Sequence, residues 1–503
     1  MKDTMLNAAI TTAHPQEGKI CIQRECVPVN PVPEGVLVEN QVVNLYPGFT
    51  YQTILGFGGA MTESAAYALS LLPKEKRNEA IRAYFGENGS GYTLIRTHID
   101  SCDFALGMYQ AVPDSDPELA SFSIERDRQY ILPALRAAME VADKPIWVLL
   151  SPWSPPASWK TPPSLLKNIH SQEDLKKFLP PELSDAKLQA SHPVLHALYT
   201  SLCASLESGE GIRKCGGHLK PEYYGSWAKY LVKYVQAYLD EGIPVHWLSI
   251  QNEAQAATPW DSCQWTAQEE KTFLRDYLYP AMAEAGLTDR VGILFWDHNK
   301  ENLLDRTLEV LDDQTRPMVA GAAFHWYSGD HFDAVRMVHE RFPELHLLFT
   351  EGCCPMVSTG SEEELQQGVR YAHDMIENLN SGMDAWFDWN LYLDEHGGPN
   401  HVNNFCSAPI MLDGKGGYEK RSSYQYIRQI TQNIQPGAVR IGCTKYTADL
   451  DVTAFQNPNQ QIVGILLNRS QEEKTVNLRL EGKTCKVVIP AQGIASVKIS
   501  ENL

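Results

Sequence analysis

The sequence is poor in basic residues and has no long apolar run. Lys and Arg number 43 against 62 Asp and Glu in 503 residues, which gives a net charge of −19. This negative charge disfavours binding to nucleic acid or anionic lipid. No stretch approaches the ~20 apolar residues that span a bilayer, and the first residues lack the apolar core of a signal peptide. We therefore expect a cytoplasmic protein with neutral ligands, no nucleic-acid partner and no stable membrane association.

Motifs that mark cofactor, metal or serine-nucleophile chemistry are also missing. GFGGAM lacks the G-x-G-x-x-G spacing of a dinucleotide site, and neither G-x-x-x-x-G-K-[ST] nor G-x-S-x-G occurs. There is no H-E-x-x-H and no paired C-x-x-C. The eleven cysteines are scattered and odd in number, as expected for reduced, mostly buried thiols. We predict no metal and no cofactor. A metal hydrolase stays open as an alternative, and its candidate ligands are His298, His325, His331, Asp297 and Asp103.

Between about residues 50 and 390, short apolar runs alternate with helical patterns. The runs are TILGFGGAMTES, YTLIRTHIDSCDF, KPIWVLLSPWSPP, VHWLSIQNE, VGILFWDHN, AGAAFHWYS, LHLLFTEG and MDAWFDWN. Helices are predicted from Trp227 to Gly242 and from Gln268 to Gly286. Eight βα units predict a (β/α)8 TIM barrel at 48–430, with an insertion at about 163–215; a doubly wound open sheet is the rival architecture.

Both chain ends have the alternating pattern of β-strands instead. After residue 430 the segments LDVTAFQ, QIVGILLNRS, KTVNLRL, CKVVIP and IASVKIS alternate apolar and polar residues. KICIQREC and GVLVENQVVNLY read as strands before the barrel begins. We therefore predict a flanking β-sandwich built from residues 1–47 and 431–503.

Polar and aromatic residues stand where the predicted barrel strands end, on the face that carries barrel active sites. They are Glu63, Asp100, Asp103, Trp153, Asn252, Glu253, Asp297, His298, His325, Tyr327, Glu351, Asp388, Trp389 and Asn390, with Arg96 as the most evident internal cation. Such a lining suits a sugar, with its hydroxyls and flat C–H faces. Glu253 and Glu351 each close a strongly apolar run, on the fourth and seventh strands. Two carboxyls of this kind are what glycoside hydrolysis requires, although strand-end glutamates also serve in ion pairs.

Several motifs resemble glycoside hydrolase family 30, especially its glucosylceramidase branch. They are GFGGAMTES, SCDF, SPWSPPASWK, QNE, HWY, TEGC, DWNLYLDEHGGPN and LNRS, in family order along nearly the whole chain. The resemblance implies a retaining mechanism, with Glu253 as acid/base and Glu351 as nucleophile. It also implies that Asn252 binds the sugar 2-hydroxyl, that Asp103 and Trp153 contact the non-reducing sugar, that His325 and Tyr327 support the nucleophile, and that Trp389 and Asn400 line the glycone or aglycone side.

The expected substrate is a small-molecule β-glycoside or oligosaccharide. A soluble β-glucoside or β-linked gluco-oligosaccharide is favoured over bilayer glucosylceramide, because the chain is acidic and shows no evident membrane-binding patch. A β-xylosidase or β-fucosidase of the same family is the alternative, since pocket shape and not a short motif selects the sugar. A non-catalytic carbohydrate-binding protein is the alternative from another class.

Overall fold

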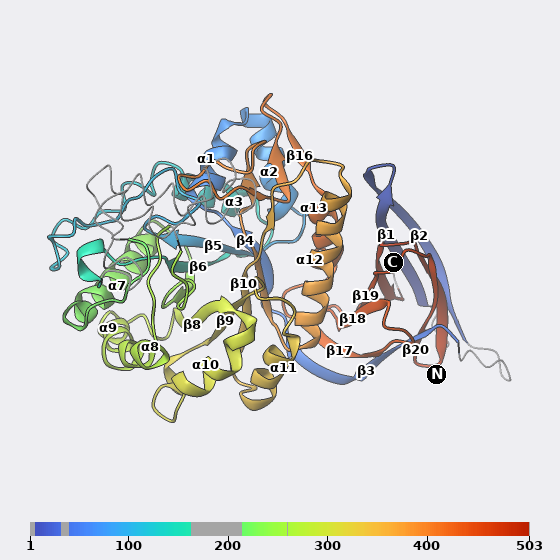
Figure 1. Ribbon diagram of the computed structural model, residues 1–503. Helices are drawn as coiled ribbons and strands as arrows, with labels where there is room; N and C mark the ends of the chain where they lie inside the picture. The colour runs from blue at the N-terminus through green and yellow to red at the C-terminus, as the bar shows by residue number, and fades with distance from the viewer. Residues whose placement is uncertain (1–5, 32–39, 162–213, 259, 502–503) are drawn as a thin grey trace, which may run out of the picture.

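The computed structural model describes residues 6–31, 40–161, 214–258 and 260–501. The chain forms two modules that lie side by side: a barrel surrounded by helices, and a smaller all-β module (Figure 1). Apart from its last two residues, the predicted insertion at about 163–215 lies outside the described residues.

Eight parallel strands close into the predicted barrel, which excludes the open sheet. Their order around the barrel is β4 (Gly56–Ala60), β5 (Leu94–Ile99), β6 (Trp147–Pro152), β7 (Val245–Ser249), β8 (Gly292–Asn299), β9 (Gly321–His325), β10 (His346–Glu351) and β12 (Ala385–Asp388). Large apolar side chains such as Leu94, Trp247 and Phe387 fill the centre of the barrel. Gly58 leaves room for the neighbouring strand, since a Cβ there would lie 1.9 Å from the carbonyl oxygen of Leu94. The barrel is therefore a packed core whose carboxyl end holds the polar residues.

Helices cover the outside of the barrel. They are α1 (Glu63–Leu71), α2 (Lys74–Phe85), α3 (Ile131–Val141), α7 (Tyr224–Asp240), α8 (Ala267–Phe273), α9 (Tyr279–Glu284), α10 (Leu303–Val310), α11 (Phe332–Arg341), α12 (Glu362–Asn380) and α13 (Ser422–Thr431), with short 3-10 turns at Ala157–Trp159, Pro221–Tyr223, Lys300–Asn302 and Arg316–Met318. The helix predicted to end at Gly242 is α7. The helix predicted from Gln268 to Gly286 is interrupted by a π-helical turn, Leu274–Leu278. Pro280, two residues after this turn, lacks the N–H that a regular helix would use, which accounts for the wider turn.

The β module contains strands from both ends of the chain, as predicted. Its strands pair in the order β1 (Leu6–Gln16), β2 (Lys19–Pro31), β21 (Lys483–Ile489), β20 (Lys474–Leu480), β3 (Val42–Thr53), β17 (Val439–Thr444), β18 (Leu450–Gln456), β19 (Ile462–Asn468) and β22 (Ile494–Ser500). β22 pairs back onto β1, with Ala8 opposite Ile499, so the pairing closes on itself. Alternate side chains point inward and form a separate apolar core.

Helices α12 and α13 lie between the two modules (Figure 1). His373 of α12 contacts Asp451 of β18 at 2.7 Å, and Ser496 of β22 donates to Gln429 of α13 at 2.8 Å. Outward-facing residues of the β module, such as Phe455, pack into the apolar core that surrounds the barrel. The β module therefore braces the helices beside β10 and β12.

Small sheets lie in the loops that follow β10 and β12. One joins β11 (Cys354–Pro355) to β14 (Cys406–Ser407), and the other joins β13 (Tyr392–Leu393), β15 (Ile410–Leu412) and β16 (Tyr418–Lys420). Apolar side chains from these loops pack with Trp153 and Trp389. This cluster fixes the aromatic residues at the strand ends.

Candidate active site

Arg96 of β5 lies at the centre of a polar network. Its guanidinium is fully buried and donates to Glu351 Oε2 at 2.6 Å, Asn252 Oδ1 at 2.8 Å and Asp297 Oδ2 at 3.0 Å. It also donates to Ser151 Oγ at 3.1 Å. A planar guanidinium can satisfy several acceptors in fixed directions, which an ammonium group cannot. Arg96 therefore connects side chains from β6, β8 and β10 with one from the segment that follows β7.

Asp297 is the second buried charge of this network. Ser249 donates to its Oδ2 at 2.7 Å, Thr350 donates to its Oδ1 at 2.5 Å, and His325 Nε2 lies 3.1 Å from Oδ1. These bonds and the charge of Arg96 outweigh burial and hold the pKa of Asp297 well below its usual range. Asp297 is therefore a carboxylate that orients its neighbours.

The backbone at the ends of β7 and β8 directs these side chains. Asp297 and Glu253 have φ values of 46° and 49°, and the N–H of Glu253 donates to the carbonyl of Asp297 at 2.7 Å. The pairing of β8 with β9 shifts between Trp296 and His298, as in a β-bulge. Left-handed backbone is strained for these residue types and tends to occur at functional sites.

Glu351 ends β10 and is bound from two sides. Besides Arg96, the hydroxyl of Tyr327 donates to Glu351 Oε1 at 3.0 Å. The same hydroxyl lies 3.4 Å from Cys353 Sγ, which in turn lies 3.3 Å from Cys406 Sγ. All cysteines that the structure describes are free thiols. Glu351 is 7% exposed, so a charged carboxylate here depends on these two donors.

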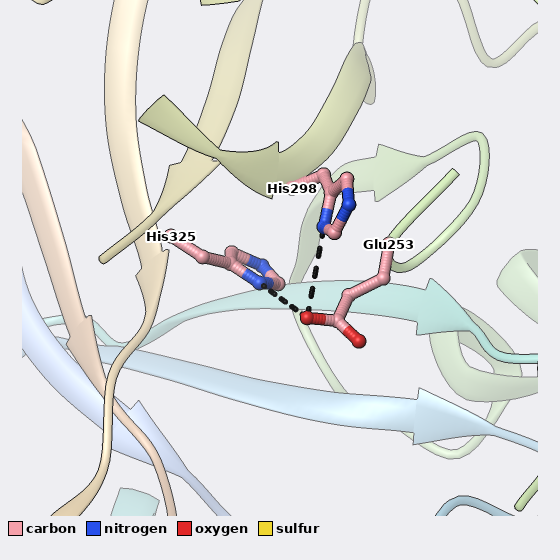
Figure 2. A group of neighbouring side chains, drawn as sticks. All are labelled: Glu253, His298 and His325. Atoms are coloured by element: carbon pink, nitrogen blue, oxygen red, sulfur yellow. Dashed lines mark ion pairs between the residues drawn. The ribbon is translucent and has the colours of Figure 1, made fainter. Parts of the chain in front are cut away.

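Glu253 faces two histidines. His298 Nδ1 and His325 Nδ1 each lie 3.6 Å from Glu253 Oε1 (Figure 2). Burial opposes protonation of His325, but the charge of Glu351 and the contacts with Asp297 and Glu253 raise the pKa of His325 to about 9. Glu253 therefore lies beside a histidine that is protonated at neutral pH.

The pKa directions and the contact distances rank the two glutamates differently. Burial raises the pKa of Glu351 against the opposing charges of His325 and Arg96. Burial acts on Glu253 in the same sense, but the imidazoles of His298 and His325 override it and lower the pKa of Glu253. The two imidazoles lie 3.6 Å from Glu253, whereas Arg96 is always charged and contacts Glu351 at 2.6 Å. The shorter contact with a permanent cation therefore favours the ionised form of Glu351.

An aromatic wall and a buried aspartate lie beside this network. The rings of Trp153 and Trp389 stack at 5.4 Å, and Arg96 lies 5.0 Å from the first ring and 5.4 Å from the second. Asn404 donates to Asp103 Oδ2 at 3.0 Å. Burial, with the charges of Glu351 and Glu253, raises the pKa of Asp103 well above its usual range. Carboxyl, amide and indole groups together form a surface suited to sugar hydroxyls and C–H faces.

Family models match both modules of the chain. The glycosyl hydrolase family 30 TIM-barrel domain matches residues 54–168 and 172–427, and the beta sandwich domain of the same family matches residues 437–497. The chain belongs to glycosyl hydrolase family 30. It is therefore a glycoside hydrolase, and the resemblance seen in its motifs is confirmed.

Individual proteins that are similar to this chain add to this result. The chain is 28% identical over 451 residues to lysosomal acid glucosylceramidase of Mus musculus, which covers 86% of this chain and 78% of the relative. It is 24% identical over 405 residues to the endo-1,6-beta-D-glucanase neg1 of Aspergillus fumigatus, covering 79% and 73%. SrfJ from Salmonella typhimurium superposes with a TM-score of 0.83 at 29% identity over 98% of this chain and 99% of that chain.

No helix among the described residues has the length and apolarity needed to cross a membrane.

Most of the side chains predicted for this family 30 site meet in one place. The contacts above join Asn252, Glu253, His325, Tyr327 and Glu351 to the Arg96 network, with the Trp153–Trp389 pair and Asp103 beside it. Asn400 differs from these residues, because its hydrogen bonds are made within its own loop. Its amide donates to the carbonyl of Asn404 and accepts from two backbone N–H groups of its own loop. It thereby holds the loop that brings Asn404 to Asp103.

Asp297 and Asn404 are among the residues of this network that the sequence analysis did not assign to binding or catalysis. Asp297 was considered only as a strand-end residue and a metal ligand. Its position inside the apolar run GILFWDHN was a usable signal, because a buried carboxylate requires partners. Asn404 has no such signal, since it stands in a polar loop and its contact with Asp103 is set by tertiary structure.

Proposed function

We propose that this protein is a retaining β-glucosidase in which Glu351 is the nucleophile and Glu253 the acid/base. The observation that carries the assignment is the pair of contacts on Glu351, with Arg96 at 2.6 Å and Tyr327 at 3.0 Å. A permanent cation and a hydroxyl donor keep a carboxylate ionised and oriented, as a nucleophile requires. Glu253 has no permanent cation in contact, so it is the group better able to gain and lose a proton.

The reaction then follows two displacement steps. Glu351 attacks the anomeric carbon while Glu253 gives its proton to the leaving oxygen, and a glycosyl-enzyme forms. Water attacks this intermediate as Glu253 takes back a proton, which restores the original anomeric configuration. For this mechanism we expect the carboxyl groups of Glu253 and Glu351 to lie about 5 to 5.5 Å apart. Asn252, held by Arg96 through Oδ1, keeps its amide N–H groups for the sugar 2-hydroxyl.

Two kinds of relative support glucose as the sugar on the non-reducing side. By their names, glucosylceramidases act on glucose linked to ceramide, and endo-1,6-beta-D-glucanases act on glucose linked to glucose. Both kinds of enzyme therefore bind a glucosyl group. The shared group is the glycone, which Asp103 and Trp153 would contact. We propose a soluble β-glucoside or β-linked gluco-oligosaccharide, because the net charge of −19 disfavours association with an anionic lipid surface.

Azide rescue of two variants tests both glutamate assignments on an activated aryl β-glucoside. Glu351→Ala should lose turnover and, with azide, form the α-glucosyl azide, because azide replaces the nucleophile and inverts the anomeric carbon. Glu253→Ala should form the β-glucosyl azide, because azide then attacks the glucosyl-enzyme. Glu364→Gln, a buried glutamate of α12 that accepts from the backbone of Ser422 at 2.6 Å, is the matched control and should retain turnover.

The products decide between the alternatives. If Glu351→Ala formed the β-glucosyl azide and Glu253→Ala the α-glucosyl azide, the two glutamates would have the opposite roles. Turnover of the xyloside or fucoside, but not the glucoside, in a panel of nitrophenyl β-glycosides would reject glucose. Sugar binding without turnover of any member would favour a carbohydrate-binding protein.

A further inference from the structure

Three potential metal ligands converge on the acid/base side of the active site. They are Glu253 Oε1, His298 Nδ1 and His325 Nδ1, and the ligand atoms of these residues all lie within 4.8 Å of one another. Figure 2 shows both rings directing a nitrogen toward the same carboxylate oxygen, at 3.6 Å each. The proposed hydrolysis uses only the glutamate of this group, so the two histidine nitrogens need another explanation.

Both nitrogens are buried and lack a hydrogen-bond partner within normal distance. His325 is fully buried and His298 is 9% exposed, and the Nδ1 atom of each is unsatisfied among the described residues. A buried polar atom without a partner destabilises the folded state, because its desolvation is not compensated. An electron-pair acceptor placed between these nitrogens and Glu253 would remove that cost.

The outer contacts of His325 are those of a metal-binding histidine. Its Nε2 lies 3.1 Å from Asp297 Oδ1, and Asp297 is itself fixed by Ser249, Thr350 and Arg96. A carboxylate that accepts from one ring nitrogen directs the lone pair of the other nitrogen toward the metal. In this site the nitrogen so directed is Nδ1, which faces Glu253, and a bound metal would displace the proton that His325 carries at neutral pH.

The spacing suits a small tetrahedral ion. Metal–ligand bonds of about 2.0–2.2 Å in a tetrahedron place neighbouring ligand atoms roughly 3.3–3.5 Å apart. The two 3.6 Å separations from Glu253 Oε1 are close to this value. Two imidazoles and one carboxylate suit Zn²⁺ better than Mg²⁺ or Ca²⁺, which prefer oxygen ligands.

We propose that Glu253, His298 and His325 form a Zn²⁺ site that inhibits the enzyme when it is filled. The ion would take the lone pair that Glu253 needs for proton transfer and would occupy the place of the leaving oxygen. Binding itself does not depend on the glycosidase assignment, but the inhibition rests on the proposed role of Glu253. The fourth tetrahedral position remains open for water or a substrate hydroxyl.

The competing zinc site in this region is the thiol pair Cys353 and Cys406, with sulfur atoms 3.3 Å apart beside Tyr327. Zinc binding is therefore measured by calorimetry on the wild-type chain, His298→Gln and Cys353→Ser, with Co²⁺ absorption as a second readout. We expect one ion per chain in the wild type, at least ~10-fold weaker binding in His298→Gln, and unchanged affinity in Cys353→Ser. Circular dichroism of each variant checks the fold, and Glu253→Gln should weaken binding as well.

Inhibition is measured on the same samples. Zinc should raise the apparent KM of the wild-type enzyme for a nitrophenyl β-glucoside, and EDTA should reverse the effect. Absence of zinc binding, equal affinity in folded His298→Gln, or loss of binding in Cys353→Ser would each overturn the site. Zinc binding as expected in a chain that hydrolyses no glycoside would instead refute the proposed function and leave the site intact.

Discussion

Arg96→Lys tests whether the guanidinium, and not only its charge, organises the active site. Arg96 contacts Glu351, Asn252, Asp297 and Ser151 at 2.6 to 3.1 Å. An ammonium group on a flexible stem keeps the charge but cannot meet these acceptors in the same fork geometry. We therefore expect lysine to retain part of the electrostatic attraction and to lose at least two of the four bonds.

The magnitude follows from which bonds are lost. A hydrogen bond that involves a charged group contributes about 1.5–3 kcal/mol. Loss of the bonds that orient Glu351, the proposed nucleophile, and Asn252, the proposed sugar-binding residue, should raise the activation barrier by about 3 kcal/mol, which is roughly a 10²-fold fall in kcat/KM. Arg96→Met removes the charge as well and leaves buried carboxylates unpaired, at a cost of about 3–5 kcal/mol in the free energy of unfolding.

Steady-state kinetics on an aryl β-glucoside and urea denaturation measure these two effects. Arg421→Lys is the matched control, because Arg421 is also buried and donates to the carbonyl of Val357 at 2.9 Å beside Glu364. That variant should lose stability while kcat/KM stays within about twofold. Wild-type kcat/KM in Arg96→Lys, or equal kinetic losses in both lysine variants, would show that the guanidinium geometry is not what organises the site.

Three further substitutions probe separate parts of the molecule. Tyr327→Phe removes the 3.0 Å donor to Glu351 and should lower kcat/KM by roughly 10- to 100-fold with little change in melting temperature, because the Tyr327 side chain is 40% exposed. Asp103→Asn should raise KM by about 10-fold or more and leave the unfolding free energy nearly unchanged, as measured by kinetics and denaturation. Asp100→Asn should flatten the dependence of stability on pH. Burial raises the pKa of Asp100 to about 7, so between roughly pH 4 and 7 the folded state holds a proton that the unfolded state has released, and rising pH removes up to about 4 kcal/mol of stability. Parallel pH–stability curves for wild type and Asp100→Asn would contradict this reasoning.

The barrel and the two-ended β module were predictable because their signals are local. Each barrel strand is a short apolar run that ends in polar residues, and HLLFTE shows this pattern as clearly as any. The pairing of β1 with β22 was predictable only as membership of one module. Its register, with Ala8 opposite Ile499, depends on packing between the two ends of the chain. The π-helical turn before Pro280 was missed because the apolar spacing continues through it.

The active site also has a part that could be predicted from the sequence and a part that could not. The two candidate glutamates could be picked out because each ends an apolar strand and glycoside hydrolysis needs two carboxyls, but their separate roles remain a prediction that rests on the resemblance to family 30. The network that links them could not be found, because it depends on backbone that turns left-handed at Asp297 and on a bulge between β8 and β9. These features set which side chains point at Arg96, and hydrophobic periodicity carries no information about them.

The charge balance of the network explains how one glutamate can act as acid and then as base. Glu253, Asp297 and Glu351 are three carboxyls, and Arg96 with protonated His325 supplies two positive charges. In the free site the negative charge of Glu351 opposes the two imidazoles that lower the pKa of Glu253, since like charges raise each other's pKa. When Glu351 forms the glycosyl ester its charge is lost, and the remaining cations then favour ionised Glu253. The covalent step itself would therefore convert Glu253 from the acid that assists departure into the base that activates water.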